Sequence, residues 1–393
     1  MSLFENVTTA PPDPILGLTE TFKKDSRSSK INLSVGVFQD ASGTTPVLAS
    51  VKEAERRLLE REKSKNYKPI DGDPEYDRRV RELLFGSNSE LVEGGRAVTA
   101  HTPGGTGALR VLADFLNKNT PGRTVLMSDP TWANHGQIFA AAGLATRPYP
   151  YFDKASNGLA FEPMLAALAC APSQSVVLLH ACCHNPTGVD PTSEQWQRIG
   201  EIVRDRELFP FVDFAYQGFA TGVDADADSV RILSTYTDEL AICSSFSKNF
   251  GLYNERTGAL TLVAKSAERA AAVQSQVKVC IRANYSNPPA HGGSIVSTIL
   301  GDAELRKQWL GEVDAMRQRI ADMRRLFVET LRGTGVARDF SFIARQNGMF
   351  SFSGLTPEQV QLLRDEHAIY IVSSGRINVA GLNEQTLPIV CKA

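Results

Sequence analysis

The sequence of 393 residues predicts an α/β fold in which a mostly parallel sheet is covered by helices on both faces. Short, continuous apolar runs alternate with stretches of helical periodicity, and several runs end in polar or turn residues. Strands that are buried on both faces have continuous apolar sequences, whereas a strand with one solvated face alternates. The runs that predict strands are 125–127, 176–180, 211–213, 240–243 and 259–264.

Two of the predicted helices begin with a capping box, in which the first residue and the fourth exchange side-chain and backbone hydrogen bonds. Thr192 and Gln195 have this spacing ahead of an apolar pattern that continues to Ile202. Thr356 and Gln359 have the same spacing near the C-terminus. Both pairs predict where a helix starts.

A long amphipathic helix is predicted over 305–331, where apolar residues recur at steps of three and four and Gly333 is a plausible stop. Short strand-like pieces at 350–352 and 369–372 follow it. Pro11, Pro12 and Pro14 and weak periodicity predict an extended N-terminal arm. The predicted organisation is an arm that also contributes to a small domain (1–45), a large domain (46–315) and a small C-terminal domain (316–393).

Composition limits the classes of partner. Apolar residues make up 42% of the chain, charged residues 22%, and the net charge of -2 gives no basic excess for nucleic acid. No apolar run approaches the roughly 20 residues that span a bilayer, and the N-terminus lacks the pattern of a secretory signal. The six cysteines form no Cys-x-x-Cys pair, which favours reduced thiols and a cytoplasmic location.

Lys248 is the most informative residue of the chain. It follows the predicted strand 240–243, hydroxyl groups of Ser245 and Ser247 flank it, and Arg256 lies eight residues on. Burial at a strand end lowers the pKa of a lysine and makes its amine nucleophilic, as imine chemistry requires. The alternative is a surface lysine in a serine-rich turn.

The segment 101–109 is a glycine-rich turn that opens a helix, and such a turn offers free backbone N–H groups to an anion. It is not a dinucleotide fingerprint, because Arg110 stands where the third glycine would be. It also lacks the Gly-Lys-Ser/Thr ending of a nucleoside-triphosphate loop. Taken alone, a structural turn is an equal alternative to a phosphate site.

Two patterns that imitate metal sites are better explained otherwise. His180 and His184 have the spacing of a helical zinc pair, but they end an apolar strand and have no acidic partner at the right spacing. A second pattern resembles the start of a calcium loop but lacks its glycine and final acid, which favours a solvated acidic loop at Asp224, Asp226 and Asp228. We therefore expect no metal.

The chain resembles the fold-type I pyridoxal-phosphate enzymes of the class I aminotransferase family, and within it the bacterial aspartate aminotransferases. The resemblance runs nearly end to end. It is carried by the motifs TPGGTGALR (102–110), CCHNPTG (182–188), DFAYQGF (213–219), SKNFGLYNER (247–256), IRANYSNPP (281–289) and SGRINVAG (374–381). It implies a seven-stranded sheet in a large, cofactor-binding domain beside a smaller α/β domain.

The resemblance also implies a cofactor and the residues that bind it. Pyridoxal 5'-phosphate would be attached to Lys248, with Asp213 beside its ring nitrogen and Tyr216 and Asn185 at its phenolic oxygen. Trp132 would stack on the ring and border the substrate, although a tryptophan of the core is the alternative. The residues that match the phosphate site are Gly104, Gly105, Thr106, Ser245, Ser247 and Arg256, with Tyr67 from a second subunit.

The implied reaction is a ping-pong transfer of the amino group of L-aspartate to 2-oxoglutarate, which yields oxaloacetate and L-glutamate in a homodimer with shared active sites. Arg376 would bind the α-carboxylate, with Gly36 and Asn185 nearby, and Arg282 of the neighbouring subunit would bind the distal carboxylate. The alternative is an aromatic amino-acid aminotransferase, and Gln39, where lysine is common, weakens strict dicarboxylate preference. A binding protein that has lost catalysis is the alternative from another class.

Overall fold

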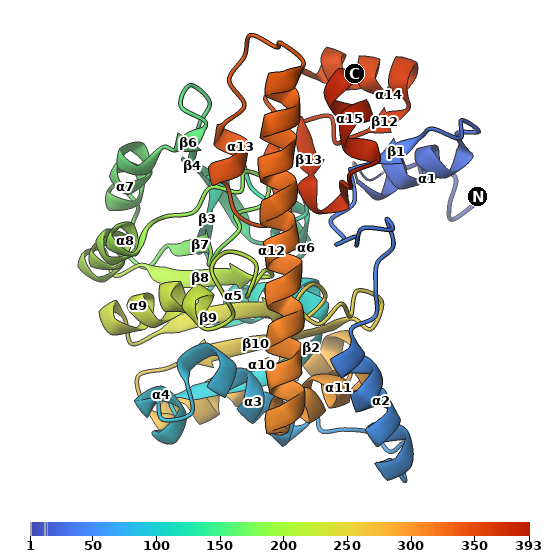
Figure 1. The fold of residues 1–393 in the computed structure, drawn as a ribbon. Helices are drawn as coiled ribbons and strands as arrows, with labels where there is room; N and C mark the ends of the chain where they lie inside the picture. Colours follow the sequence, from blue (N-terminus) through green and yellow to red (C-terminus); the bar gives the residue numbers. More distant parts are fainter. Residues whose placement is uncertain (1, 12, 14) are drawn as a thin grey trace.

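A seven-stranded sheet lies at the centre of the computed structural model, which describes residues 2–11, 13 and 15–393 (Figure 1). β10 runs antiparallel to both of its neighbours, and the other adjacent pairs are parallel, so the prediction of a mostly parallel sheet is confirmed. Each of the predicted apolar runs forms a strand. In spatial order the strands are β2 (Ala97–Pro103), β10 (Thr257–Val263), β9 (Leu240–Ser245), β8 (Phe209–Phe214), β7 (Val176–His180), β3 (Thr124–Asp129) and β4 (Ala145–Pro150).

Helices cover both faces of this sheet because its strands are apolar on both sides. Along β7, Val176 and Leu178 belong to one hydrophobic core, and Val177 and Leu179 belong to another. The first core includes α5 (Gly104–Asn119), α6 (His135–Ala141) and α10 (Ala267–Asn284). The second includes α2 (Ala49–Arg61), α3 (Pro74–Phe85), α7 (Phe161–Ala169), α8 (Ser193–Asp205), α9 (Asp228–Tyr236), α11 (Ala290–Gly301) and the first part of α12 (Ala303–Gly333).

The long helix α12 connects the sheet to the C-terminal elements, as Figure 1 shows. Trp309 and Val313 near its start pack in the core of the sheet, whereas Met323 and Phe327 pack in a third core. This third core combines residues from both ends of the chain. The predicted division at residues 45 and 315 stays a prediction.

Two short pairs of strands lie outside the central sheet and contribute residues to the third core or lie beside it. β1 (Ile31–Asn32) pairs in parallel with β12 (Ile369–Tyr370), and β11 (Phe350–Phe352) pairs antiparallel with β13 (Arg376–Asn378). The remaining elements are α4 (Glu90–Glu93), β5 (Phe152–Asp153), β6 (Gly158–Leu159), α13 (Phe342–Arg345), α14 (Pro357–His367), α15 (Thr386–Lys392) and the 3-10 turns η1 (Ala225–Ala227) and η2 (Val379–Gly381).

The extended arm predicted for the first 45 residues is wrong over 16–24, which form the helix α1 (Leu16–Lys24). The ring of Phe22 on this helix lies 5.3 Å from the ring of Tyr370, edge to face. A helix of nine residues is too short to show a clear hydrophobic period in the sequence. It is stabilised instead by packing against a residue that lies far away in the chain. Pro12 and Pro14 lie outside the described residues.

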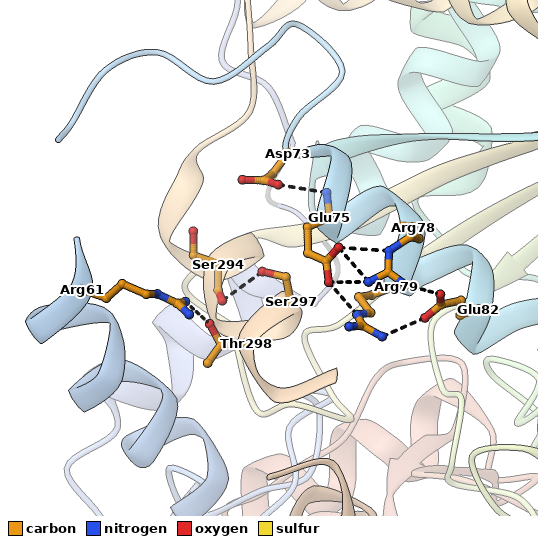
Figure 2. Close-up of polar contacts among 9 residues, drawn as sticks. All are labelled: Arg61, Asp73, Glu75, Arg78, Arg79, Glu82, Ser294, Ser297 and Thr298. Carbon is orange, nitrogen blue, oxygen red and sulfur yellow. Dashed lines mark hydrogen bonds and ion pairs between the residues drawn. The ribbon is translucent and has the colours of Figure 1, made fainter. Parts of the chain in front are cut away.

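The segment between α2 and α3 is exposed over residues 62–67, and Figure 2 shows the contacts of Arg61 and Asp73 at its two ends. Arg61 at the end of α2 donates a hydrogen bond to Thr298 of α11 (3.0 Å), and the side chain of Asp73 caps α3 by accepting from the Glu75 N–H (3.0 Å). Between these anchors Tyr67 is 93% exposed.

All six cysteines are free thiols, and five of them are buried. In the described part of the chain, no helix combines the length and the apolar character needed to cross a membrane.

Candidate active site

A cavity of about 460 Å³ lies beyond the carboxyl ends of β7, β8 and β9. This is the edge at which parallel α/β sheets bind ligands. Most of the predicted site residues line the cavity. Those lining it are Gly36, Gly105, Thr106, Trp132, Asn185, Asp213, Tyr216, Ser245, Ser247, Lys248, Arg256 and Arg376.

Lys248 follows β9 and extends its amine into the cavity. Its Nζ lies 4.8 Å from the centre of the Tyr216 ring. Burial lowers the pKa of Lys248 to about 8, against the opposing charge of Asp213. About a tenth of the amine is therefore uncharged at pH 7, far more than for an exposed lysine, and the uncharged amine is the nucleophilic form.

Asp213 lies at the end of β8 and is held by a histidine from the adjoining helix α6. His135 Nε2 lies 3.0 Å from Asp213 Oδ2, and His135 Nδ1 lies 2.9 Å from the Thr131 hydroxyl. Burial alone would raise the pKa of Asp213, but the hydrogen bond from His135 leaves it below its ordinary value. The carboxylate is thus a fixed negative charge at one end of the cavity.

The opposite end of the cavity is suited to an anion. α5 starts at Gly104, and its N-cap, Pro103, supplies no side-chain acceptor for the first backbone N–H groups. Arg256 Nη1 donates to the Ser247 hydroxyl (3.4 Å) beside this helix end. A Cβ on Gly104 would lie 2.4 Å from Arg256 Nη2, so glycine allows the arginine to approach the helix terminus.

Arg376 on β13 is 4% exposed and bears a charge that no carboxylate in the described residues neutralises. Its Nη2 donates to the Ser34 carbonyl (2.6 Å) and its Nη1 to Asn185 Oδ1 (3.3 Å), while its buried Nε has no hydrogen-bond partner in the described part of the chain. Burial lowers the pKa of Arg376 to about 10, which still leaves it charged at neutral pH. A buried, incompletely bonded guanidinium is a strong site for a carboxylate.

Two predicted residues, Tyr67 and Arg282, lie outside the cavity and are exposed. Arg282, near the end of α10, donates a hydrogen bond to Ser286 on its own chain. Gly104 does not line the cavity itself, but it contacts Arg256, which does.

Among the residues of the site that sequence reasoning missed are His135 and Phe350. His135 carries the hydrogen bond to Asp213, and Phe350 lines the cavity next to Arg376. Neither belongs to a motif with recognisable spacing, because each reaches the site from an element that is distant in sequence from its partner. The apolar run that predicted β11 included Phe350 but not its contact with an arginine.

The two patterns that imitate metal sites have other partners in the structure. His184 is hydrogen-bonded through both ring nitrogens, Nε2 to Ser128 and Nδ1 to Thr187, each at 2.9 Å. The nitrogens of His135 and His180 do lie within 4.8 Å of each other and of a carboxylate oxygen of Asp213, in an arrangement where His135 already donates to that carboxylate.

The prediction of a solvated acidic loop is wrong for Asp226, whose carboxylate is buried. It accepts hydrogen bonds from the backbone N–H groups of Gly218 (2.8 Å), Ala220 (3.0 Å), Thr221 (2.8 Å) and Gly222 (3.3 Å). These four bonds replace the water that a buried carboxylate loses. Asp224, in contrast, is exposed and pairs with Arg231.

Comparison with known proteins identifies the family of this chain. The family model for aminotransferase class I and II matches residues 28–393. The chain belongs to this family. Among class I and II aminotransferases it is 56% identical to an aspartate aminotransferase of Salmonella typhi and 55% identical to that of Escherichia coli, covering 100% of this chain and 99% of each relative. A solved aromatic-amino-acid aminotransferase of Burkholderia pseudomallei, covalently bound to pyridoxal phosphate, is 50% identical with a TM-score of 0.97 and covers 100% of this chain and 98% of that one.

Proposed function

We propose that the protein transfers the amino group of L-aspartate to 2-oxoglutarate, giving oxaloacetate and L-glutamate in a pyridoxal-phosphate-dependent, ping-pong reaction. The observation that carries this proposal is one cavity that holds a lysine with a lowered pKa, a fixed carboxylate, an anion site and a buried arginine without a carboxylate partner among the described residues. The relatives named aspartate aminotransferase support the choice of substrate.

The residues of the cavity fit pyridoxal phosphate at both of its ends. The phosphate would lie at the start of α5, held by backbone N–H groups from Gly104 to Thr106, by the hydroxyls of Ser245 and Ser247, and by Arg256. The uncapped helix end and the close approach of Arg256 to Gly104 support this placement.

The ring would lie between Lys248 and Asp213. The Asp213 carboxylate, fixed by His135, would keep the ring nitrogen protonated. Burial raises the pKa of Tyr216, so its hydroxyl keeps its proton and can donate to the phenolic oxygen of the ring. Because Asn185 Oδ1 already accepts from Arg376, its amide N–H₂ remains to donate to the same oxygen, and Trp132 would stack on the ring.

When bound, the cofactor supplies an electron sink for negative charge that develops at the substrate Cα. Lys248 would remove the proton from that carbon and return it to the cofactor side, since an amine with a pKa near 8 can both accept and release a proton close to neutral pH. Arg376 would fix the α-carboxylate by a bidentate pair next to Gly36, which orients the Cα–H bond toward the amine.

We further propose a homodimer in which Tyr67 and Arg282 of one subunit complete the site of the other. Tyr67 and Leu59 are 93% and 83% exposed, among the highest values of the large hydrophobic side chains in the described residues, which supports a face that a second subunit covers. Arg282 would then bind the distal carboxylate of aspartate or 2-oxoglutarate. The free thiols support a cytoplasmic location.

An aromatic amino-acid aminotransferase is the second candidate, because the similar solved structure from Burkholderia pseudomallei bears that name. The cavity also has apolar walls from Ile15, Val35 and Val37, which could accept a ring. A comparison of kcat/KM for aspartate and phenylalanine, each with 2-oxoglutarate, decides between the two. A higher value for aspartate supports the proposal, and a higher value for phenylalanine supports the alternative. If neither amino acid is turned over or changes the absorption of the bound cofactor, the protein is not an aminotransferase of this specificity.

A further inference from the structure

Arg324 on α12 is a buried cation that forms no ion pair with a carboxylate among the described residues. Its side chain is 2% exposed, and burial lowers its pKa to about 10, so it is charged at neutral pH. All of its nitrogens donate instead to one short stretch of chain. The acceptors are the carbonyls of Ile343 (2.9 Å), Asn347 (3.1 Å), Gly348 (3.2 and 2.7 Å) and Phe350 (2.6 Å), and the Ser351 hydroxyl (2.6 Å).

Within this stretch, residues 346–350 are also held by the loop that contains Asn185. The Asn347 backbone N–H donates to the Gly188 carbonyl (2.7 Å), and its side chain donates to Asp190 Oδ2 (3.0 Å). Asp190 in turn accepts from the backbone N–H of His184 (2.9 Å). A Cβ on Gly188 would lie 2.7 Å from the Phe350 carbonyl oxygen, so the two loops are in close contact.

The stretch ends in Phe350, whose ring contacts the substrate end of the cavity. The guanidinium carbon of Arg376 lies 4.2 Å from the ring centre, within the range of a cation–π interaction. The ring of Tyr216 meets it edge to face at 6.1 Å. A Cβ on Gly36 would lie 2.6 Å from Phe350 Cζ, so the ring also fixes how close the Gly36 segment can come.

We propose that Arg324 is a positioning residue for substrate binding: it fixes residues 346–350 so that the Phe350 ring holds the guanidinium of Arg376 in the orientation that receives the α-carboxylate. The inference rests on the proposed role of Arg376. An arginine suits this position because its donors spread in a plane and reach several carbonyls at once, whereas a lysine ammonium is a single point of donation.

The test is to replace Arg324 by Met and by Lys in the cofactor-loaded enzyme. We expect KM for both aspartate and 2-oxoglutarate to rise roughly tenfold while kcat changes much less, since only binding of the carboxylate is weakened. Calorimetry with succinate, an unreactive dicarboxylate, should show a similar loss of affinity. The absorption band of the covalently bound cofactor should stay, because Arg324 makes no hydrogen bond to Lys248 or Asp213 among the described residues.

Arg325 provides a matched control. It is the next residue of the same helix, its side chain is 61% exposed, and it pairs with Asp322 on the surface. Arg325→Met should leave KM and succinate affinity unchanged. Arg324 variants that fold and bind succinate as tightly as the unaltered enzyme would overturn the inference. A loss confined to kcat would also overturn it, since that would indicate general distortion of the site.

Arg376→Lys separates failure of this inference from failure of the proposed function. If Arg376→Lys weakens succinate binding and the Arg324 variants do not, only the inference about Arg324 fails. If Arg376→Lys has no effect, the assignment of Arg376 is wrong and the inference falls with it. Should neither Arg324 variant fold, Asn347→Ala decides: it removes the side-chain bond to Asp190 and should raise KM in the same direction, and an unchanged KM would overturn the inference.

Discussion

The amine of Lys248 loses its proton more readily than an exposed lysine because burial removes water from its charged form. In the unfolded chain its pKa returns to the ordinary 10.5, against about 8 in the fold. Between these values the unfolded state binds more protons, so the folded protein gains stability as the pH rises.

This difference predicts the pH dependence of the cofactor-free protein. Relative to Lys248→Met, whose side chain carries no charge, the unaltered protein should gain up to roughly 3 kcal/mol of unfolding free energy between pH 8 and pH 10.5. Urea unfolding of both proteins across that range measures the difference. A constant difference would show that the lysine is not desolvated, and below pH 8 the curves should run parallel.

Replacement of the Asp213 carboxylate should slow proton removal without unfolding the protein. Asp213→Asn keeps the size of the side chain but cannot hold a ring nitrogen protonated by charge, so single-turnover rates should fall by at least roughly tenfold. Cofactor retention, followed by absorption, should stay close to normal. Single-turnover rates equal to those of the unaltered enzyme would assign the ring partner to another residue.

The two proposed substrate arginines should separate by substrate. Arg282→Ala should lower kcat/KM for aspartate by at least about tenfold, because the loss of a charge-assisted pair costs on the order of 1.5–3 kcal/mol. It should spare phenylalanine, which has no distal carboxylate. Arg376→Ala should impair both amino acids, since both have an α-carboxylate. Steady-state kinetics with 2-oxoglutarate in excess would contradict this scheme if Arg282→Ala reduced both substrates equally.

Among the individual site residues, the sequence predicts those at the ends of strands. It misses those that reach the site only through contacts with distant parts of the chain. Asp213 lies at the end of β8, and Lys248 and Asn185 follow β9 and β7, where apolar runs end in polar residues, so their gathering at one edge was predictable. His135 and Phe350 contribute through contacts with residues far away in the chain, and no local spacing encodes such a contact.

Among the elements, helix starts were the most predictable feature. The capping boxes at Thr192 and Thr356 are both present, because the bonds that define them join residues three apart and are encoded locally. The helix α1 was missed, since its stability comes from packing against the C-terminal part of the chain. The buried carboxylate of Asp226 was missed for a different reason: acidic residues at three alternate positions look like a solvated loop, and nothing in that pattern shows that nearby backbone N–H groups turn toward one of them.

Asp226 in η1 carries a prediction about an element, because its carboxylate holds the turn that follows Tyr216. Asp226→Asn should lower the unfolding free energy by about 2–4 kcal/mol, because an amide presents only one acceptor oxygen to four backbone N–H groups. Asp224→Asn, in the exposed part of the same segment, should change it by less than about 1 kcal/mol. Thermal or urea unfolding of both variants gives the comparison, and equal losses would contradict a special role for Asp226.

For the whole molecule, the proposed shared site predicts complementation between inactive subunits. A mixture of Lys248→Ala and Arg282→Ala proteins should form hybrid dimers in which one of the two sites combines an intact lysine with an intact arginine. Activity on aspartate should rise above that of either parent after subunit exchange. Mass spectrometry of the mixture verifies that hybrids form. If hybrids form and activity does not rise, or if the active species is a monomer, the shared site is wrong.

The pairing of β1 with β12 determines when this molecule can become functional during its synthesis. A ribosome releases Ile31 long before it makes Ile369, so the first strand has no neighbour until nearly the whole chain has emerged. The sheet of β2 to β10 can assemble in the meantime, because all of its strands are made earlier. Closing so long a loop is slow, since its entropy is lost before the contacts form. Arg376, the proposed site of the α-carboxylate, arrives in that same late segment, so on this proposal a nascent chain can complete its central sheet and still be unable to bind an amino acid.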